Sequence, residues 1–256
     1  MVISSQVMGQ KTFQPKVNQF DWQGIIYRKE TAFEIRLHTN GALIGVNLGK
    51  IKTYYKTNYY HLSLGYLRDP REKRQNRNLS FSLNDRSKSF TFGKQNSIIN
   101  LRGGIGVRRY LSEKARRRGI AVGYDFMFGP SLAILKPSYV EQIVTTDSNG
   151  ATIRTTKPIK YTDETAEVFT SFNDIYGGSG YFTGFGELSV VPGLQGKIGL
   201  FFSLGAFDKV VKSVEVGMMG DLFVKKIPIM VETDEVSNKP YFLNFYVNFT
   251  FGKRTN

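Results

Sequence analysis

The most constraining feature of this 256-residue sequence is an alternation of apolar and polar side chains that recurs along nearly the whole chain. The segment 241–251 shows it most clearly. Because successive side chains of a β-strand point to opposite faces, a period of two predicts a strand. Such a strand would aggregate in water unless its apolar face met a core or lipid. That face carries Tyr241, Leu243, Phe245, Val247, Phe249 and Phe251.

Seven further segments share this period, so we expect eight strands and an all-β fold. Residues 187–205 keep one parity across Pro192, which favours a single long strand that is bulged or extended at the proline. One short helix is expected within residues 165–175. The other seven predicted strands cover residues 33–38, 42–48, 59–66, 97–110, 120–134, 187–205 and 210–224.

The lengths of the connections between these strands are unequal. In an up-and-down arrangement, the long connections 69–96, 136–186 and 225–240 fall on one rim, and the other rim receives only short turns. Outer-membrane barrels have this asymmetry, with short periplasmic turns and longer extracellular loops. The pattern therefore predicts an eight-stranded antiparallel transmembrane β-barrel with long loops on one rim.

The residues opposite the apolar stripe indicate which face lies inside. This stripe is rich in glycine, which weakens a solvated strand but relieves crowding inside a narrow barrel. We therefore expect an interior charge network of Glu34, Arg36, Arg102, Arg108, Asp125, Glu187, Lys197, Glu215 and Asp221. The lipid-facing surface is expected to include Ile44, Leu62, Val122, Phe126, Leu200, Val216, Phe245 and Phe249. Aromatic residues near the rims are expected at the headgroup level, namely Tyr54, Tyr55, Tyr59, Tyr60, Tyr110, Tyr241 and Phe251.

Composition excludes several classes of protein. The chain has no cysteine, so disulfides, thiolate metal sites and cysteine nucleophiles are excluded. It has no apolar run of about 18 residues, which excludes a transmembrane helix. The formal net charge is +14, but the basic residues fall on opposite rims, so we expect no nucleic-acid partner. His38 and His61 are the only histidines and belong to no cluster with metal-ligand spacing, so neither a metal nor another cofactor is expected.

The tail, residues 244–254, resembles the strand endings of small outer-membrane β-barrel proteins of Gram-negative, Bacteroidota-type bacteria. The resemblance implies an outer-membrane location, contact with outer-membrane lipids and lipopolysaccharide, and recognition of the last strand by the barrel-assembly machinery. It assigns an assembly signal to Tyr241, Phe245, Phe249 and Phe251, although five residues follow that last aromatic. Residues 1–22 are then expected to be a clipped signal remnant and periplasmic segment, and residues 23–256 the barrel domain.

An eight-stranded barrel is filled by its own side chains, which argues against a porin. We therefore expect a non-enzymatic protein with a structural or interaction role, including that of a subunit in a larger envelope complex contacted through loop 136–186. A first alternative is a lipid A-modifying hydrolase that uses His61 and Ser63. Their spacing resembles the His-x-Ser pair of outer-membrane lipid A deacylases, but parity places them on the inner face. A second alternative is a soluble β-barrel that binds an apolar ligand.

Overall fold

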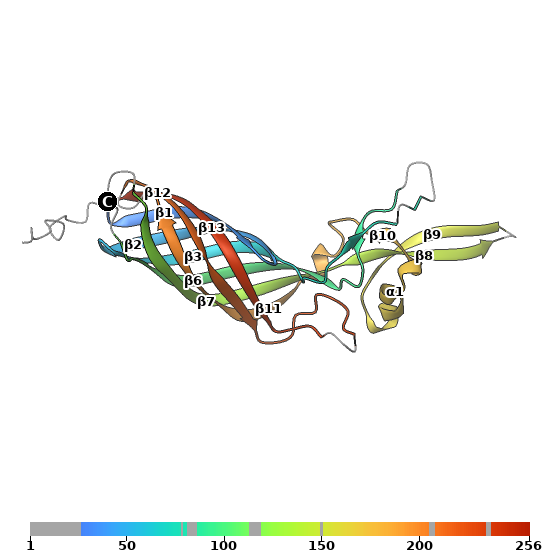
Figure 1. Cartoon of the computed structure of the whole chain (residues 1–256). Coiled ribbons are helices and arrows are strands. Elements are labelled where there is room, and N and C mark those ends of the chain that lie inside the picture. The colour runs from blue at the N-terminus through green and yellow to red at the C-terminus, as the bar shows by residue number, and fades with distance from the viewer. Residues whose placement is uncertain are drawn as a thin grey trace, which may run out of the picture.

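The computed structural model describes residues 27–77, 79–80, 86–112, 119–148, 151–204, 208–233 and 237–256. The predicted signal remnant, residues 1–22, lies outside these ranges. The described chain is an all-β protein with a closed eight-stranded antiparallel barrel and one short α-helix (Figure 1).

The barrel is an up-and-down meander. Each barrel strand pairs with its neighbours in the chain, and β1 closes the cylinder by pairing with β13 from Lys29 opposite Thr255 to His38 opposite Tyr246. The eight predicted strands are therefore confirmed. In chain order they are β1 (Lys29–His38), β2 (Gly41–Thr53), β3 (Lys56–Leu67), β6 (Asn96–Tyr110), β7 (Ala121–Pro137), β11 (Ser189–Ser203), β12 (Val210–Phe223) and β13 (Tyr241–Thr255).

The predicted long strand is confirmed as β11, which runs unbroken through Pro192. Pro192 pairs with Leu132 of β7, and the ladder between β11 and β12 begins one residue later, at Gly193. The carbonyl of Pro192 accepts from the amide of Val224, the residue after the end of β12. The nitrogen of Pro192 points to the same side as this carbonyl, where no further residue of β12 pairs with β11. A proline is tolerated there because its missing N–H interrupts no ladder hydrogen bond.

The described parts of the three long connections fold into an extension at one end of the barrel, which we call the loop module (the described residues within 68–95, 138–188 and 224–240; Figure 1). Its main sheet has the order β10, β8, β9, and its core contains Phe90, Val140, Phe169 and Ile175. These segments were predicted only as loops, apart from the helix, which is α1. Within the described residues, the module contains β4 (Arg74–Gln75), β5 (Phe90–Thr91), β8 (Tyr139–Ser148), β9 (Ala151–Lys160), α1 (Ala166–Thr170), β10 (Ile175–Gly178) and three short 3₁₀ helices (Asp163–Thr165, Phe172–Asp174 and Phe185–Glu187).

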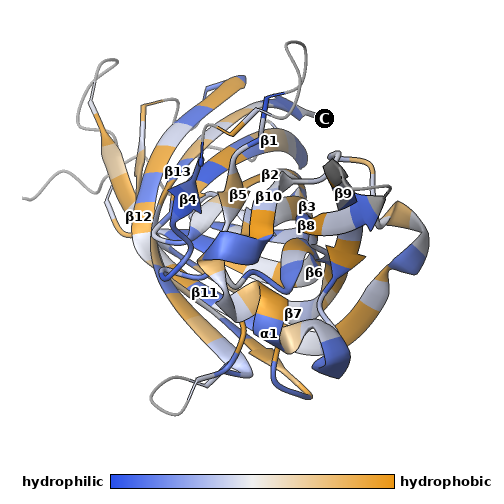
Figure 2. Cartoon of the chain, turned by 90° about the vertical axis from the view of Figure 1, so that its right-hand side faces the viewer, coloured by the Kyte–Doolittle hydropathy of each residue, from blue (hydrophilic) through white to orange (hydrophobic). Residues whose placement is uncertain are grey.

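Burial alternates residue by residue along the barrel strands. In β1 every second side chain is buried, and the buried set is polar or charged apart from Ala32. The exposed set of the same strand includes Phe33, Ile35 and Leu37. Hydrophobic and hydrophilic residues alternate in the same way along the other strands (Figure 2). The barrel is thus inside out relative to a water-soluble protein, with its charges within and its large apolar side chains outside.

Candidate functional site

The barrel strands bury equal numbers of acidic and basic residues. Buried charges are tolerated when they are paired, and each charged group of this interior lies beside at least one of opposite sign. Because the two signs balance, the interior contributes nothing to the formal charge of +14. The five acidic residues are Glu30, Glu34, Asp125, Glu215 and Asp221, and the five basic residues are Arg36, Arg102, Arg108, Lys197 and Arg254.

Lys197 bridges two carboxylates in the middle of the barrel. Its Nζ lies 3.0 Å from Oδ1 of Asp125 and 2.7 Å from Oε1 of Glu215. The Tyr59 hydroxyl donates to Asp125 at 2.5 Å, and the Tyr246 hydroxyl donates to Glu215. These contacts join five strands across the lumen, so the interior is a polar core.

Two further clusters extend this core toward the barrel ends. Nε and Nη2 of Arg102 donate to the two carboxylate oxygens of Asp221 at 2.8 and 2.9 Å. Near the short-turn end, the Glu30 carboxylate accepts from Arg108 at 3.0 Å and from Arg254 at 2.9 Å. The first pair connects β6 with β12, and the second cluster connects β1, β6 and β13.

The predicted His61 and Ser63 pair lies in a continuous chain of hydrogen bonds. Nε2 of His61 is 2.9 Å from Oγ of Ser63, and Nδ1 is 2.7 Å from Oδ1 of Asn47. The Asn47 amide donates to Glu34 at 2.8 Å, and Arg36 donates to the same carboxylate at 2.7 Å. Because Oδ1 of Asn47 can only accept, Nδ1 carries the imidazole proton and Nε2 accepts from the serine hydroxyl. This is the geometry of a nucleophile beside a general base.

Both members of the pair are on the inner face, as parity predicted. His61 is 4% exposed and Ser63 is 3% exposed. The loop end of the barrel is closed above them by a hydrophobic cluster, in which side chains at the strand ends pack against the last long connection. A lipid substrate would have to enter the filled barrel to reach the serine. The closing cluster includes Leu67, Ile98, Leu135, Val191, Phe223, Ile227, Ile229 and Met230.

One predicted interior charge is wrong. Glu187 precedes β11, which begins at Ser189, and it lies in a 3₁₀ helix of the loop module. Its carboxylate accepts from Lys160 at 2.7 Å and from the Tyr139 hydroxyl at 3.1 Å. The prediction extended the strand alternation past the first residue of the strand, where parity no longer determines the direction of a side chain.

Sequence reasoning also missed members of the interior. Glu30 shares the parity of Glu34 in β1, and Arg254 shares the parity of the inward residues of β13, so extending the alternation to the strand ends would have found both. Tyr59 and Tyr110 were expected at the headgroup level, but both are buried inside. The Tyr110 ring packs edge-on against Phe201 at 5.0 Å between ring centroids.

Interior glycines make room for the large side chains of the lumen. A Cβ atom added at Gly106 would lie 2.2 Å from Cζ of Tyr59. One added at Gly123 would lie 2.4 Å from Cζ of Phe201. Both distances are far below van der Waals contact, so these positions exclude any larger residue unless the rings move. Crowding inside a narrow barrel thus accounts for the glycine-rich stripe.

The outer surface of the barrel is apolar. The residues predicted to face lipid all lie on this outer face, and seven of the eight are 36% to 63% exposed: Ile44, Leu62, Phe126, Leu200, Val216, Phe245 and Phe249. Val122 is half-buried. Three of the four assembly-signal residues, Tyr241, Phe245 and Phe251, are more than half exposed there, and Phe249 is exposed at 36%. Within the described residues, the helices are all too short or too polar to cross a membrane.

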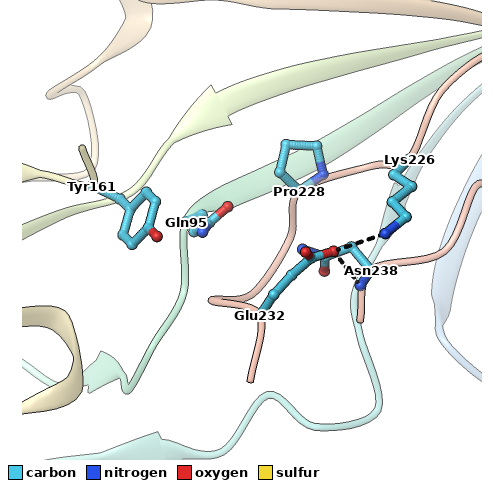
Figure 3. Close-up of a pocket in the computed structure, with 6 residues that line it drawn as sticks. All are labelled: Gln95, Tyr161, Lys226, Pro228, Glu232 and Asn238. Atoms are coloured by element: carbon cyan, nitrogen blue, oxygen red, sulfur yellow. Dashed lines mark hydrogen bonds and ion pairs between the residues drawn. The ribbon is translucent and has the colours of Figure 1, made fainter. Parts of the chain in front are cut away.

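A cleft lies at the base of the loop module, where the module meets the ends of β6 and β7. It consists of two hollows of about 280 and 400 Å³ that share Gln95 and Tyr161. In Figure 3, Tyr161 and Gln95 lie on one side of the first hollow, with Glu232 and Lys226 on the other. The first hollow is also lined by Pro228 and Asn238, and the second by Asn96, Pro137, Lys160, Thr162 and Glu187.

Two ion pairs border the cleft. Nζ of Lys226 is 3.6 Å from the Glu232 carboxylate, and Nζ of Lys160 is 2.7 Å from the Glu187 carboxylate. The hydrogen bond from Lys160 lowers the pKa of Glu187, and the Tyr139 hydroxyl lowers this pKa further. The Glu187 carboxylate is therefore ionised at neutral pH, and its charge is matched by that of Lys160.

No protein-family model matches the chain, and a search of curated proteins finds no significant match. Its function must therefore be argued from its own geometry.

That geometry disfavours some chemistries. Among the described residues, no group of three His, Asp or Glu side chains is arranged to hold a metal ion. A barrel that holds an apolar ligand needs an apolar lumen, whereas this lumen is lined by paired charges and amides. The features that remain for function are the apolar outer wall, the sealed polar core and the loop module.

Proposed function

We propose that this chain is an outer-membrane β-barrel with a filled interior, which anchors the loop module at the cell surface in a structural or interaction role. The observation that carries the proposal is the reversed polarity of the barrel, with paired charges inside and large apolar side chains outside. In water this wall would be an aggregation hazard. In a bilayer it is the favourable arrangement, because a closed barrel also satisfies its backbone hydrogen bonds.

An aromatic patch next to the barrel supports an outer boundary for the membrane. Tyr181 and Phe182 are 72% and 82% exposed, and both rings contact Phe185. Nζ of Lys136 lies 5.3 Å from the Tyr181 ring centroid and 5.1 Å from that of Phe185. The patch is followed closely along the chain by Leu188, which is 46% exposed and lies immediately before the first residue of β11. Aromatic rings beside a lysine favour the level of the lipid headgroups.

The shape of the molecule supports an interaction role. The hairpin of β8 and β9 extends away from the barrel along its long axis (Figure 1). The module has its own core, which includes Phe90, Val140 and Phe169, so it presents a defined surface. Structured extensions on a rigid scaffold are where binding is commonly found. A subunit of a larger envelope complex would contact its partner through this module, chiefly within residues 136–186.

The proposal is tested by membrane fractionation combined with surface labelling. The protein should sediment with outer membranes, require detergent for extraction, and migrate differently on gels with and without heating. Because the sequence has no cysteine, single-cysteine variants can be labelled without background. Asp163→Cys in the loop module should react with a membrane-impermeant maleimide on intact cells. Lys253→Cys at the short-turn end should react only after the outer membrane is permeabilised. Recovery in the soluble fraction would refute the proposal.

A further inference from the structure

Two polar side chains that line the cleft, those of Gln95 and Tyr161, form no hydrogen bond with the described residues. Neither the Gln95 side-chain amide nor the Tyr161 hydroxyl has a hydrogen-bond partner within the described part of the chain. Both side chains line both hollows, so they lie where the two hollows meet. Figure 3 shows them on one side of the first hollow. An amide and a hydroxyl together offer donors and acceptors to a ligand.

Hydrogen bonds hold the backbone of Gln95 in place, and packing holds the ring of Tyr161. The backbone N–H of Gln95 donates to the Ile229 carbonyl at 2.8 Å, and the backbone carbonyl of Gln95 accepts from the Ser138 N–H at 2.8 Å. The Tyr161 ring packs edge-on against Phe169 at 5.6 Å between centroids. A ring that its neighbours hold before a ligand arrives loses little freedom on binding.

The charges around the cleft select among ligand classes. The pairs Lys226 with Glu232 and Lys160 with Glu187 place two positive and two negative charges on its walls. An anion would require an excess of cationic groups, and a cation would require an excess of carboxylates. A purely apolar ligand would leave the amide and the hydroxyl buried without partners, which is costly. A neutral ligand with many hydroxyl groups fits all three conditions.

From this arrangement we infer that the cleft binds a neutral saccharide, with one sugar ring between Tyr161 and Gln95. The aromatic ring offers a surface for the C–H face of the sugar, and the amide pairs with its hydroxyls. The two adjoining hollows, about 280 and 400 Å³, provide space for a second ring beside the first. This inference goes beyond the proposed anchoring role and does not depend on it, because all the residues that line the cleft except Asn96 and Pro137 belong to the loop module.

The test uses the full-length protein in detergent micelles and saturation-transfer NMR with a panel of neutral sugars: glucose, galactose, mannose and N-acetylglucosamine, and the disaccharides cellobiose, lactose and chitobiose. Glucuronate and inorganic phosphate serve as anionic probes. We expect saturable binding of at least one neutral sugar, with the strongest transfer to its ring C–H protons. Neither anionic probe should bind more tightly.

Two conservative variants and one control locate the site. Gln95→Ala should weaken binding at least tenfold, and Tyr161→Phe should weaken it severalfold while keeping the contact with Phe169. Gln142→Ala removes the same amide from β8, outside the cleft, and should bind like the wild type. Gel mobility before and after heating verifies that each variant is folded. If a neutral sugar binds, the same titration on vesicles that carry it as a glycolipid distinguishes a membrane-borne glycan from a free one.

The inference is overturned if no neutral sugar binds, if an anionic probe binds more tightly, or if Gln95→Ala and Tyr161→Phe bind as well as Gln142→Ala. The fate of the protein in fractionation is a separate result. Recovery in the soluble fraction would refute the membrane anchor without changing any sugar titration.

Discussion

The pair between Arg102 and Asp221 gives the sharpest test of the polar core. Both side chains are at most 1% exposed and meet through two hydrogen bonds. Asp221→Asn keeps the volume but removes the charge, which leaves the guanidinium buried without its counterion. Nη1 of Arg102 has no hydrogen-bond partner in the described structure, so no alternative acceptor compensates. Breaking a buried pair in this way costs about 3–5 kcal/mol. The unfolding constant should therefore rise by roughly two to nearly four orders of magnitude.

The assay is urea unfolding of the protein in micelles, followed by gel mobility without heating and by far-ultraviolet circular dichroism. Glu187→Gln is the matched control. Its pair with Lys160 is as short, at 2.7 Å, but the two side chains are 45% and 43% exposed. An exposed pair of this kind contributes little to stability, because water and salt screen its charges. Removing both buried charges with Arg102→Met and Asp221→Asn should cost less than Asp221→Asn alone. The reasoning is refuted if Asp221→Asn costs no more than Glu187→Gln.

The remaining predictions concern the packing, the chemistry and the membrane boundary of the protein. Gly106→Ala should destabilise the barrel by about 1–3 kcal/mol in the same unfolding assay, because its new methyl group meets the Tyr59 ring. Gly196→Ala is the control, since the nearest atom to its new methyl group is 3.8 Å away. It should change stability by less than about 0.5 kcal/mol. Equal effects would argue against a crowded lumen. Mass spectra of lipid A should show the same acyl composition in cells that produce the wild type, cells that produce His61→Ala and cells that lack the protein. A change in acyl composition that requires His61 would favour the hydrolase. A fluorophore on Phe182→Cys should shift to shorter emission wavelengths when vesicles are added, while one on the exposed Phe172→Cys should not; equal shifts would contradict the proposed boundary.

The barrel was predictable because its signal is local. An alternation with a period of two fixes the inward and outward sides of a strand without knowledge of its partners. The final strand illustrates this. Parity alone predicts that Phe245 and Phe249 face outward and that Asn248 between them faces inward, as the structure shows. The same alternation extended to the ends of β1 and β13 would have supplied Glu30 and Arg254.

The loop module was not predictable from such patterns. Its strands β8 and β9 are paired with each other, but the position of β10 depends on contacts with a segment more than thirty residues earlier in the chain. The cleft combines Gln95, Tyr161 and Lys226 from three separate connections, and no spacing in the sequence indicates that they meet. The prediction that Glu187 lies inside the barrel was wrong for a related reason, because strand pairing, and not the composition of the segment, sets the start of β11.

The most direct test of the outward apolar wall is a fluorescence quenching measurement in bilayers. A polarity-sensitive fluorophore is attached to Phe126→Cys and Leu200→Cys on the outer face of the barrel, and to Asp163→Cys in the loop module as the control. The folded protein is placed in vesicles whose lipids carry bromine atoms on their acyl chains. The two barrel labels should be strongly quenched, and the label at position 163 should not. Unquenched emission at both barrel positions in the folded protein would contradict the membrane assignment.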